Sequence, residues 1–257
     1  MQNKVVVITG ASSGIGASLA QQTGSAGASV VLVARREKEL NEVAARSGNH
    51  TLTVVADVTK RAEHERVVAS AIAKFGHIDA WVNNAGRGIT RLPSQITDDD
   101  FDSMMLVNVK SALYGMQAVL PHFKERQAGH IINVSSMLGR LPLATFRSAY
   151  VASKHALNAL TAGFRMELRP DFPGIQVSSV HPGIVATEFG ANALHGGADS
   201  RSFPGAQSAE EVAAVIATTI GTRRADVYTR DGAQTMVVNY YSAPDMGEAE
   251  QKPPFMR

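Results

Sequence analysis

The sequence has no cysteine among its 257 residues. Disulfides, a thiolate nucleophile and thiolate metal ligands are therefore excluded. It also has little net charge, because 25 basic residues face 23 acidic ones, and the basic residues are dispersed along the chain. Nucleic-acid binding normally requires clustered basic residues, so nucleic acid is not an expected partner.

Long apolar runs are also missing. The first one, residues 5–8, is too short for the core of a signal peptide, and no other stretch approaches the length of a membrane span. We therefore expect a cytoplasmic protein with no membrane partner. With 44% hydrophobic residues, the chain can bury one substantial core, which predicts a single domain over residues 1–257.

The order of apolar and amphipathic segments predicts the fold class. Short apolar runs typical of strands cover residues 5–8, 30–33, 52–55, 78–82, 130–135 and 175–180. Amphipathic stretches typical of helices lie between them, at residues 37–45, 62–75, 98–127 and 148–168. Parallel strands buried on both faces need helical crossovers, so this alternation predicts an α/β fold with a doubly wound parallel sheet and helices on both faces.

In a sheet of this type, ligands bind at the carboxyl ends of the strands. Those ends carry the unusual glycine and polar residues of this sequence: 10–16, Asp57, 83–86, Ser135, Ser136 and 181–183. The acidic run at residues 98–100 follows Thr97 and fits the first turn of a helix, where the helix dipole favours acidic side chains. We expect no metal site there, because hard cations need ligands that converge from several segments.

The turn after the first apolar run reads TGASSGIG over residues 9–16. Glycines there permit a tight strand-to-helix turn and a close approach of the backbone to a pyrophosphate, which the N–H groups of the new helix attract. A glycine turn alone can be merely a structural cap. Its position between an apolar strand and a helix favours a dinucleotide site.

The end of the second strand indicates which dinucleotide binds. A fold of this type that binds NAD needs a carboxylate at this position for the ribose hydroxyls, and that carboxylate would repel a 2′-phosphate. Here Ala34 occupies the position, and Arg35 and Arg36 follow with guanidinium groups that can pair with phosphate. The sequence predicts NADP(H); the alternative is that both arginines only cap the strand on a solvated surface.

Tyr150 and Lys154 lie four residues apart in a helical segment and therefore on one face. The positive charge of Lys154 is expected to lower the pKa of the phenol, so that Tyr150 can serve as an acid and base. Such a pair alone is usually a solvated helix face. Ser135 and Ser136, at the end of the preceding strand, can hydrogen-bond a carbonyl oxygen beside the tyrosine. Asn108 is either part of this site or a core amide bonded only to backbone.

Together these motifs resemble those of the short-chain dehydrogenase/reductase superfamily. They follow one another in the same order as in that superfamily, from residue 4 to about residue 187. The resemblance rests on TGASSGIG at 9–16, Asp57-Val58, NNAG at 83–86, Asn108, Ser136, YVASK at 150–154 and Pro182-Gly183. It implies a single-domain Rossmann fold with a seven-stranded parallel sheet, a nicotinamide cofactor and an Asn-Ser-Tyr-Lys catalytic set. The C-terminal part lacks the glycine-rich ending common in tetrameric members.

The resemblance implies roles for individual residues. The catalytic set would be Asn108, Ser136, Tyr150 and Lys154, with Ser136 favoured over Ser135 although the segment from 136 to 150 is one residue longer than usual. Tyr150 would give its proton to a carbonyl oxygen that Ser136 polarises. Lys154 would also hold the nicotinamide ribose, and Asn108 would hold a water in the proton relay. The cofactor would contact Gly10, Ser12, Ser13, Gly14, Ile15, Gly16, Arg35, Arg36, Asp57, Val58, Asn84, Ala85, Gly86, Tyr150, Lys154, Pro182, Gly183, Ile184 and Thr187.

The substrate walls are expected from residues 87–94, 137–147 and 188–205. Most of their large side chains are apolar, and they include Leu138, Leu141, Leu143 and Phe146 beside Arg140 and Arg147. The segment 188–205 is either a substrate loop or a merely solvated one. Residues 242–257 are expected to form an irregular C-terminal arm.

The sequence therefore predicts an NADP(H)-dependent carbonyl reductase or alcohol dehydrogenase, without naming its substrate. One alternative is a non-catalytic NADP(H)-binding regulatory protein, which would have little need for the serine, tyrosine and lysine together. Another is a reductase of a carrier-bound 3-oxoacyl substrate, for which Arg87, Arg91 and Arg140 would supply a docking patch. A homodimer or homotetramer is expected, and a dimer would use the helices that begin near residues 98 and 148.

Overall fold

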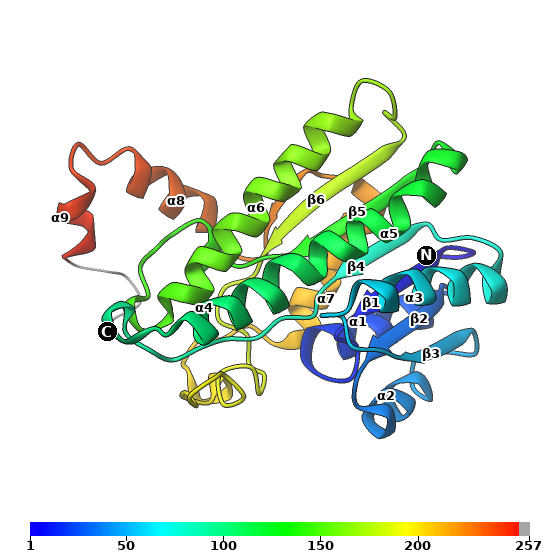
Figure 1. Cartoon of the computed structure of the whole chain (residues 1–257), viewed down its shortest axis with the longest axis horizontal. Coiled ribbons are helices and arrows are strands. Elements are labelled where there is room, and N and C mark those ends of the chain that lie inside the picture. The colour runs from blue at the N-terminus through cyan, green and yellow to red at the C-terminus, as the bar shows by residue number, and fades with distance from the viewer. Residues whose placement is uncertain (252–257) are drawn as a thin grey trace.

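The computed structural model describes residues 1–251 and contains one sheet of seven parallel strands. The order is β3-β2-β1-β4-β5-β6-β7, so the direction of winding changes between β1 and β4 (Figure 1). The strands are β1 (Val5–Thr9), β2 (Ser29–Ala34), β3 (Thr51–Val55), β4 (Ala80–Asn83), β5 (Gly129–Val134), β6 (Ile175–His181) and β7 (Asp226–Tyr228). The predicted doubly wound, seven-stranded Rossmann-like fold is confirmed.

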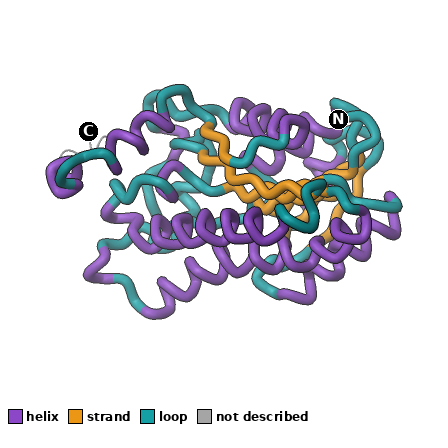
Figure 2. The backbone as a smooth tube through the Cα atoms, turned by 90° about the horizontal axis from the view of Figure 1, so that it is seen from above, coloured by secondary structure: helices purple, strands orange, loops and turns teal. Residues whose placement is uncertain are grey.

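Helices cover both faces of the sheet, and the three layers are visible in Figure 2. One face carries α1 (Gly14–Ser25), α2 (Glu37–Ala44) and α7 (Ala209–Thr222). The other carries α3 (Arg61–Phe75), α5 (Ser111–Arg126) and α6 (Ser148–Leu168). No helix within residues 1–251 is both long and apolar enough to cross a bilayer.

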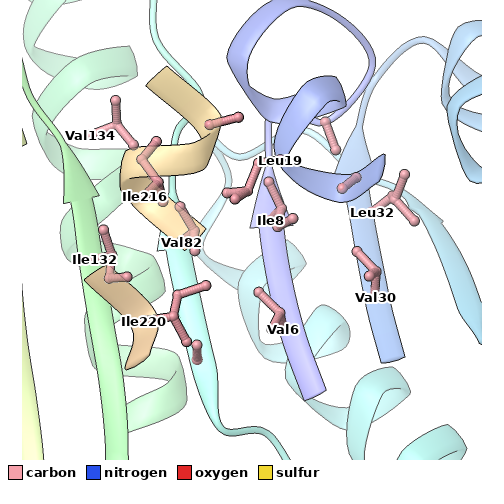
Figure 3. Close-up of a cluster of buried hydrophobic side chains, with 14 of the residues drawn as sticks. Val6, Ile8, Leu19, Val30, Leu32, Val82, Ile132, Val134, Ile216 and Ile220 are labelled. Carbon is pink, nitrogen blue, oxygen red and sulfur yellow. The ribbon is translucent and has the colours of Figure 1, made fainter. Parts of the chain in front are cut away.

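Side chains alternate between the two faces along each strand, which produces two cores. In β1, Val6 and Ile8 pack under α1, α2 and α7, whereas Val5 and Val7 point toward α3 and α5. Figure 3 shows the first of these cores, where Ile8 lies near Leu19 of α1. Because each strand is covered on both sides, its run of apolar residues is continuous, as the sequence indicates.

The helix expected over residues 98–127 is interrupted. It consists of α4 (Asp98–Met105), a π-helical turn at Leu106–Lys110 and α5. Such turns insert one extra residue into a helix and often occur at functional sites. Asn108, which the sequence analysis identifies as a candidate site residue, lies within this turn. The π-helical turn therefore sets the direction of its side-chain amide. Shorter 3-10 turns occur at Pro93–Gln95, Met137–Gly139, Thr145–Arg147 and Ser200–Ser202.

The C-terminal region differs from the expected irregular arm. After β7 come α8 (Ala233–Tyr241) and a short helix, α9 (Met246–Glu250), which extend away from the sheet in Figure 1. The Tyr240 hydroxyl donates a hydrogen bond to Glu250 at 2.8 Å, and the Asp245 carboxylate accepts one from the Gly247 N–H. These local bonds explain why residues 246–250 are helical. Residues 252–257 of the expected arm lie outside the described residues.

Candidate active site

The glycine turn between β1 and α1 is too tight for side chains. Gly10 and Gly14 have φ angles of +68° and +54°, in the left-handed region that favours glycine. A β-carbon on Gly16 would lie 2.4 Å from the Gly10 carbonyl oxygen and 2.6 Å from Nδ2 of Asn84. The glycines thus permit a tight turn packed against residues 84–85, and this turn leads directly into the N-terminus of α1, where backbone N–H groups can bind a pyrophosphate, so the residues present fit a dinucleotide.

The glycine turn is fixed to the end of β4 by Asn84 and Thr9. The Asn84 amide donates to the carbonyls of Thr9 at 3.0 Å and Gly10 at 3.3 Å. The Thr9 hydroxyl in turn accepts the backbone N–H groups of Asn84 at 3.0 Å and Ala85 at 3.1 Å. The sequence analysis did not identify this role of Thr9, although a threonine ending a buried apolar strand is a usable signal.

The end of β2 carries no carboxylate, because Ala34 is the last residue of the strand and is buried. Arg36 is exposed and reaches back to the glycine turn, donating to the hydroxyls of Ser12 at 3.0 Å and Ser13 at 2.8 Å. Its Nη1 also lies 3.5 Å from a Glu39 carboxylate oxygen, in a solvent-exposed ion pair. A guanidinium is thus placed beside the predicted phosphate cradle.

Asp57 and Val58 follow β3, two strands away from β1. Burial alone would raise the pKa of Asp57, but hydrogen bonds from Thr59 and the charge of Arg35 hold it below its ordinary value. The Thr59 hydroxyl and N–H donate to the same carboxylate oxygen at 2.8 Å and 3.0 Å. These residues therefore lie at the outer end of the predicted cofactor site.

The residues after β6 close the other side of the glycine turn. A β-carbon on Gly14 would lie 3.2 Å from the Thr187 methyl group, so Thr187 lies directly over the turn. The Pro182 carbonyl accepts the Met137 N–H at 2.8 Å, and the space beside Gly183 is bounded by the Arg230 side chain. The structure thus brings residues 182–187 next to the glycine turn, with Ile184 39% exposed.

Ser136, Tyr150 and Lys154 meet where β5 ends against α6. Tyr150 is buried, with 7% of its surface exposed, and the Ser136 side chain lies close enough to its hydroxyl to lower its pKa. Lys154 Nζ lies 5.7 Å from the centroid of the Tyr150 ring and donates to the Val134 carbonyl at 2.9 Å. Ser135 points elsewhere, toward the Lys154 carbonyl oxygen at 3.5 Å. Ser136 is therefore the serine that lies with Tyr150.

The pKa of Tyr150 differs from the expectation based on the Lys154 charge. Burial raises it, and only the Ser136 hydrogen bond and the charge of Arg147 oppose that rise. Burial also lowers the pKa of Lys154 to about 8. The reason is that both groups are removed from water, which disfavours phenolate and ammonium alike, and the ammonium is directed at a backbone carbonyl. The expected lowering by Lys154 is wrong for this arrangement.

Asn108 is fully buried and bonded on both sides of its amide. Its Oδ1 accepts the Arg87 N–H at 2.9 Å, and its Nδ2 donates to the Arg87 carbonyl at 3.0 Å and the Ser153 hydroxyl at 3.1 Å. The amide is thus satisfied within the core, but not by backbone alone, because the Ser153 hydroxyl is one of its partners. A β-carbon on Gly86 would lie 3.1 Å from Oδ1 and 3.7 Å from Lys154 Nζ, so the residue still borders the site.

The apolar surroundings of Tyr150 differ in part from the predicted walls. The Phe189 ring packs edge-on against the Tyr150 ring, with centroids 5.6 Å apart. Other apolar side chains cluster around this pair: Ile89, Ile96, Met104, Leu138, Ala149 and Leu194. Leu141 and Leu143, predicted as walls, instead pack with Ala233 and Tyr240 of α8. They are buried because α8, a helix that the sequence analysis does not predict, packs its apolar side chains against them.

The segment 188–205 is anchored to the body of the protein and is not merely a solvated loop. Leu194 forms a parallel bridge with Ile89, and its N–H donates to the Gly88 carbonyl at 2.9 Å. His195 Nε2 lies 2.6 Å from one oxygen of the buried Asp100 carboxylate, and Arg91 donates to the other at 2.7 Å. The hydrogen bond with His195 lowers the pKa of Asp100 to about 2. Asp100 thus caps α4 and also fixes the loop.

A second carboxylate, Asp226, joins two segments near the end of β6. It lies 2.8 Å from Nε2 of the buried His181 and accepts a bond from Arg140 at 2.5 Å. Arg91 and Arg140 therefore both pair with carboxylates of this chain. Of the three arginines considered for a carrier-docking patch, Arg87 is the exposed one without an ion pair among the described residues.

Comparisons with known proteins agree with this geometry. The family model described as short chain dehydrogenase matches residues 4–196. An uncharacterized oxidoreductase of Staphylococcus epidermidis is 40% identical over 190 residues, which cover 73% of this chain and 80% of that protein.

Solved structures of similar fold contain either form of nicotinamide cofactor. A short chain dehydrogenase/reductase from Burkholderia phymatum in complex with NAD gives a TM-score of 0.87 at 26% identity, covering 98% of this chain and 96% of that one. An alcohol dehydrogenase from the archaeon Thermococcus sibiricus, complexed with 5-hydroxy-NADP, gives 0.77 at 26% identity, covering 88% and 95%. Because the family match covers most of the sequence and agrees with the fold, this chain belongs to the short-chain dehydrogenase/reductase family of oxidoreductases.

Proposed function

We propose that the protein is an NADP(H)-dependent oxidoreductase that interconverts a carbonyl group and a secondary alcohol, with Tyr150 as the acid and base. The observation that carries the proposal is the meeting of Ser136, Tyr150 and Lys154 beside the glycine turn, with Asn108 behind them. A protein that only bound the dinucleotide would not need a buried phenol beside a serine hydroxyl and a lysine.

The choice of NADP(H) rests on the end of β2. Ala34 leaves no carboxylate to repel a 2′-phosphate, and the exposed Arg36 is already held next to Ser12 and Ser13. A guanidinium binds phosphate through charge-assisted hydrogen bonds, so Arg36 and the two hydroxyls would hold the 2′-phosphate. Gly10, Gly14 and Gly16 would let the backbone approach the pyrophosphate, and Thr187 would lie beside the nicotinamide.

When bound, the nicotinamide supplies or accepts the hydride. The chain's own residues handle the proton. The Ser136 hydroxyl would bind the substrate oxygen, and the Tyr150 hydroxyl would donate its proton to that oxygen. Burial keeps the pKa of Tyr150 high and therefore keeps the phenol protonated at neutral pH, as a proton donor for carbonyl reduction requires. Lys154 would hold the nicotinamide ribose.

The test is NADPH oxidation with a panel of ketones and aldehydes, with NADH measured in parallel. Tyr150→Phe removes only the hydroxyl and should lower kcat by about 100-fold or more, the scale of general acid catalysis. Tyr114→Phe is the matched control, because Tyr114 stacks with Arg61 on the outer helices, away from Ser136. Activity that survives Tyr150→Phe would refute the proposed role. Tight NADPH binding without turnover of any carbonyl would favour a regulatory protein instead.

A further inference from the structure

Arg147 is unusual among the partly buried arginines of this protein. Arg91, Arg140, Arg147 and Arg165 are half-buried within residues 1–251. Arg91 pairs with Asp100, Arg140 pairs with Asp226, and Arg165 donates to the carbonyls of Val177 and Ala225. Arg147 has no carboxylate partner and makes no side-chain hydrogen bond among the described residues. The nitrogens of Arg147 are not fully buried, but a guanidinium that is partly removed from water usually has such a partner.

The position of Arg147 is set by the segments that form the substrate side of the site. The backbone N–H of Arg91 donates to the Phe146 carbonyl at 2.8 Å, and the N–H of Arg147 donates to the Ala144 carbonyl at 2.9 Å. The guanidinium carbon lies 5.6 Å from the centroid of the Phe146 ring. Backbone bonds thus hold the residue in place, while the charged end of its side chain has no acceptor in the part of the chain that the structure describes.

The guanidinium lies at the predicted reaction site. A β-carbon on the buried Gly88 would lie 2.9 Å from Arg147 Nη1 and 3.0 Å from the Phe189 ring. Phe189 itself packs edge-on against Tyr150. The charge of Arg147 is also close enough to Tyr150 to oppose the rise of its pKa. An unpaired cation therefore stands beside the proposed proton donor, among otherwise apolar side chains.

We propose that the Arg147 guanidinium binds a carboxylate carried by the carbonyl substrate, so that oxo acids react in preference to their neutral analogues. The planar fork of arginine matches the two oxygens of a carboxylate, and the apolar surroundings strengthen such a pair. The inference rests on the function proposed above and adds the substrate class to it. It gives the guanidinium a partner that residues 1–251 do not provide.

The first test compares 2-oxo and 4-oxo acids with their methyl esters, using NADPH and the full-length protein. In the wild type, kcat/KM for the preferred acid should exceed that for its ester by about 10- to 100-fold, the scale of a charged hydrogen bond. Arg147→Gln should bring this ratio close to one, and Arg147→Lys should keep part of it. Arg169→Gln, at the other end of α6, makes the same charge change and should leave the ratio unaltered.

An equal loss on acids and esters in Arg147→Gln would overturn the inference, because Arg147 would then act only through Tyr150. Equal reduction of acids and esters by the wild type would overturn it as well, while leaving the proposed reductase activity intact. Both outcomes differ from the absence of any reduction, which would refute the proposed function.

A second test measures binding without turnover. Calorimetry compares benzoate with benzamide on the protein saturated with NADP⁺. We expect the wild type to bind benzoate at least about tenfold more tightly than benzamide, and Arg147→Gln to lose that difference. Benzoate binding that is unchanged in Arg147→Gln would overturn the inference whatever the carbonyl assays show.

Discussion

The predicted cofactor side and the predicted substrate side of the site are built by different means. On the cofactor side, the glycine turn is shaped by close backbone contacts, such as that between Gly16 and the Gly10 carbonyl. On the predicted substrate side, ion pairs and hydrogen bonds between distant segments hold the walls: Asp100 pairs with Arg91 and contacts His195, and Asp226 pairs with Arg140. Where backbone contacts fix a site, few positions can accept a larger side chain. Where pairs of side chains fix it, one pair can be replaced by another. This contrast fits a common cofactor site combined with a variable substrate site.

The largest effect is expected where the backbone contact is closest. Gly16→Ala places a β-carbon 2.4 Å from the Gly10 carbonyl oxygen, so the turn must open. We expect a loss of about 1–3 kcal/mol in the free energy of unfolding, the usual cost of overpacking, together with loss of NADPH binding. Urea denaturation and fluorescence titration measure the two effects.

Gly163→Ala is the control for this substitution. Gly163 lies in α6, and nothing lies within 4 Å of a β-carbon built on it. Alanine favours a helix over glycine, so this variant should gain up to about 1 kcal/mol and bind NADPH normally. If Gly16→Ala and Gly163→Ala behaved alike, the contrast between the two sides of the site would not hold.

The next effect concerns Arg36, the side chain that the proposed function places at the 2′-phosphate of the cofactor. Arg36→Ala should weaken NADPH binding by about 10- to 100-fold, because a charged hydrogen bond to phosphate is lost, and leave NADH binding unchanged. Lys38→Ala, in α2, removes the same charge from a neighbouring exposed position and is the control. Equal weakening of NADPH and NADH would mean that Arg36 only supports the glycine turn.

The sequence predicts the cofactor side better than the substrate side for a physical reason. The glycine turn and the residues at 83–86 are local patterns, and their constraints act on nearby backbone. The partners on the substrate side are distant, with Asp100 and His195 separated by 95 residues and Arg140 and Asp226 by 86. Nothing in the sequence around Asp100 indicates that His195 is its partner. The acidic run at residues 98–100 predicts only the first turn of a helix.

Other parts of the site also needed the fold. The π-helical turn that aims Asn108, and the helix α8 that buries Leu141 and Leu143, follow from packing and not from local preference. The raised pKa of Tyr150 depends on how completely the fold removes it from water. The sequence predicts Arg147 in a substrate wall, but only the fold shows that its side chain has no hydrogen-bond partner within residues 1–251.

A smaller effect is expected from the ion pair that anchors the substrate loop. Asp100→Asn weakens the bonds to His195 and Arg91, so the loop that carries Phe189 should hold substrate less well. We expect KM for the carbonyl to rise several-fold with little change in NADPH binding, measured by steady-state kinetics and fluorescence titration. Asp99→Asn, in the same first turn but exposed, is the control. A fall in NADPH affinity equal to the rise in KM would show that the two sides are not separate.

The same ion pair predicts a pH dependence. The pKa of Asp100 in the folded protein is lowered to about 2, so its contribution to stability is complete above its ordinary value near 3.8. That contribution declines as the pH falls through this range toward 2. The difference in Tm between the wild type and Asp100→Asn should therefore be larger at pH 7 than at pH 3. A difference that grew on acidification would contradict this sign.

The smallest effect is expected at Asp226, whose side chain is 38% exposed. Asp226→Asn weakens an ion pair that remains partly in water, so the loss of stability should stay below about 1 kcal/mol. His181 keeps its contact with the Tyr228 ring, whose centroid lies 5.0 Å away. Urea denaturation against Asp231→Asn, an exposed neighbour, measures the effect. A loss larger than that of Gly16→Ala would reverse the comparison.

The most direct test of the account needs no knowledge of the substrate. Its central claim is that the glycine turn and the end of β2 belong to a site for NADP(H), with a guanidinium placed at the 2′-phosphate and no carboxylate there. Titration of the wild-type protein with NADPH and with NADH, followed by cofactor fluorescence, measures that preference. We predict that NADPH binds at least about tenfold more tightly. Equal affinities, or tighter binding of NADH, would contradict the claim.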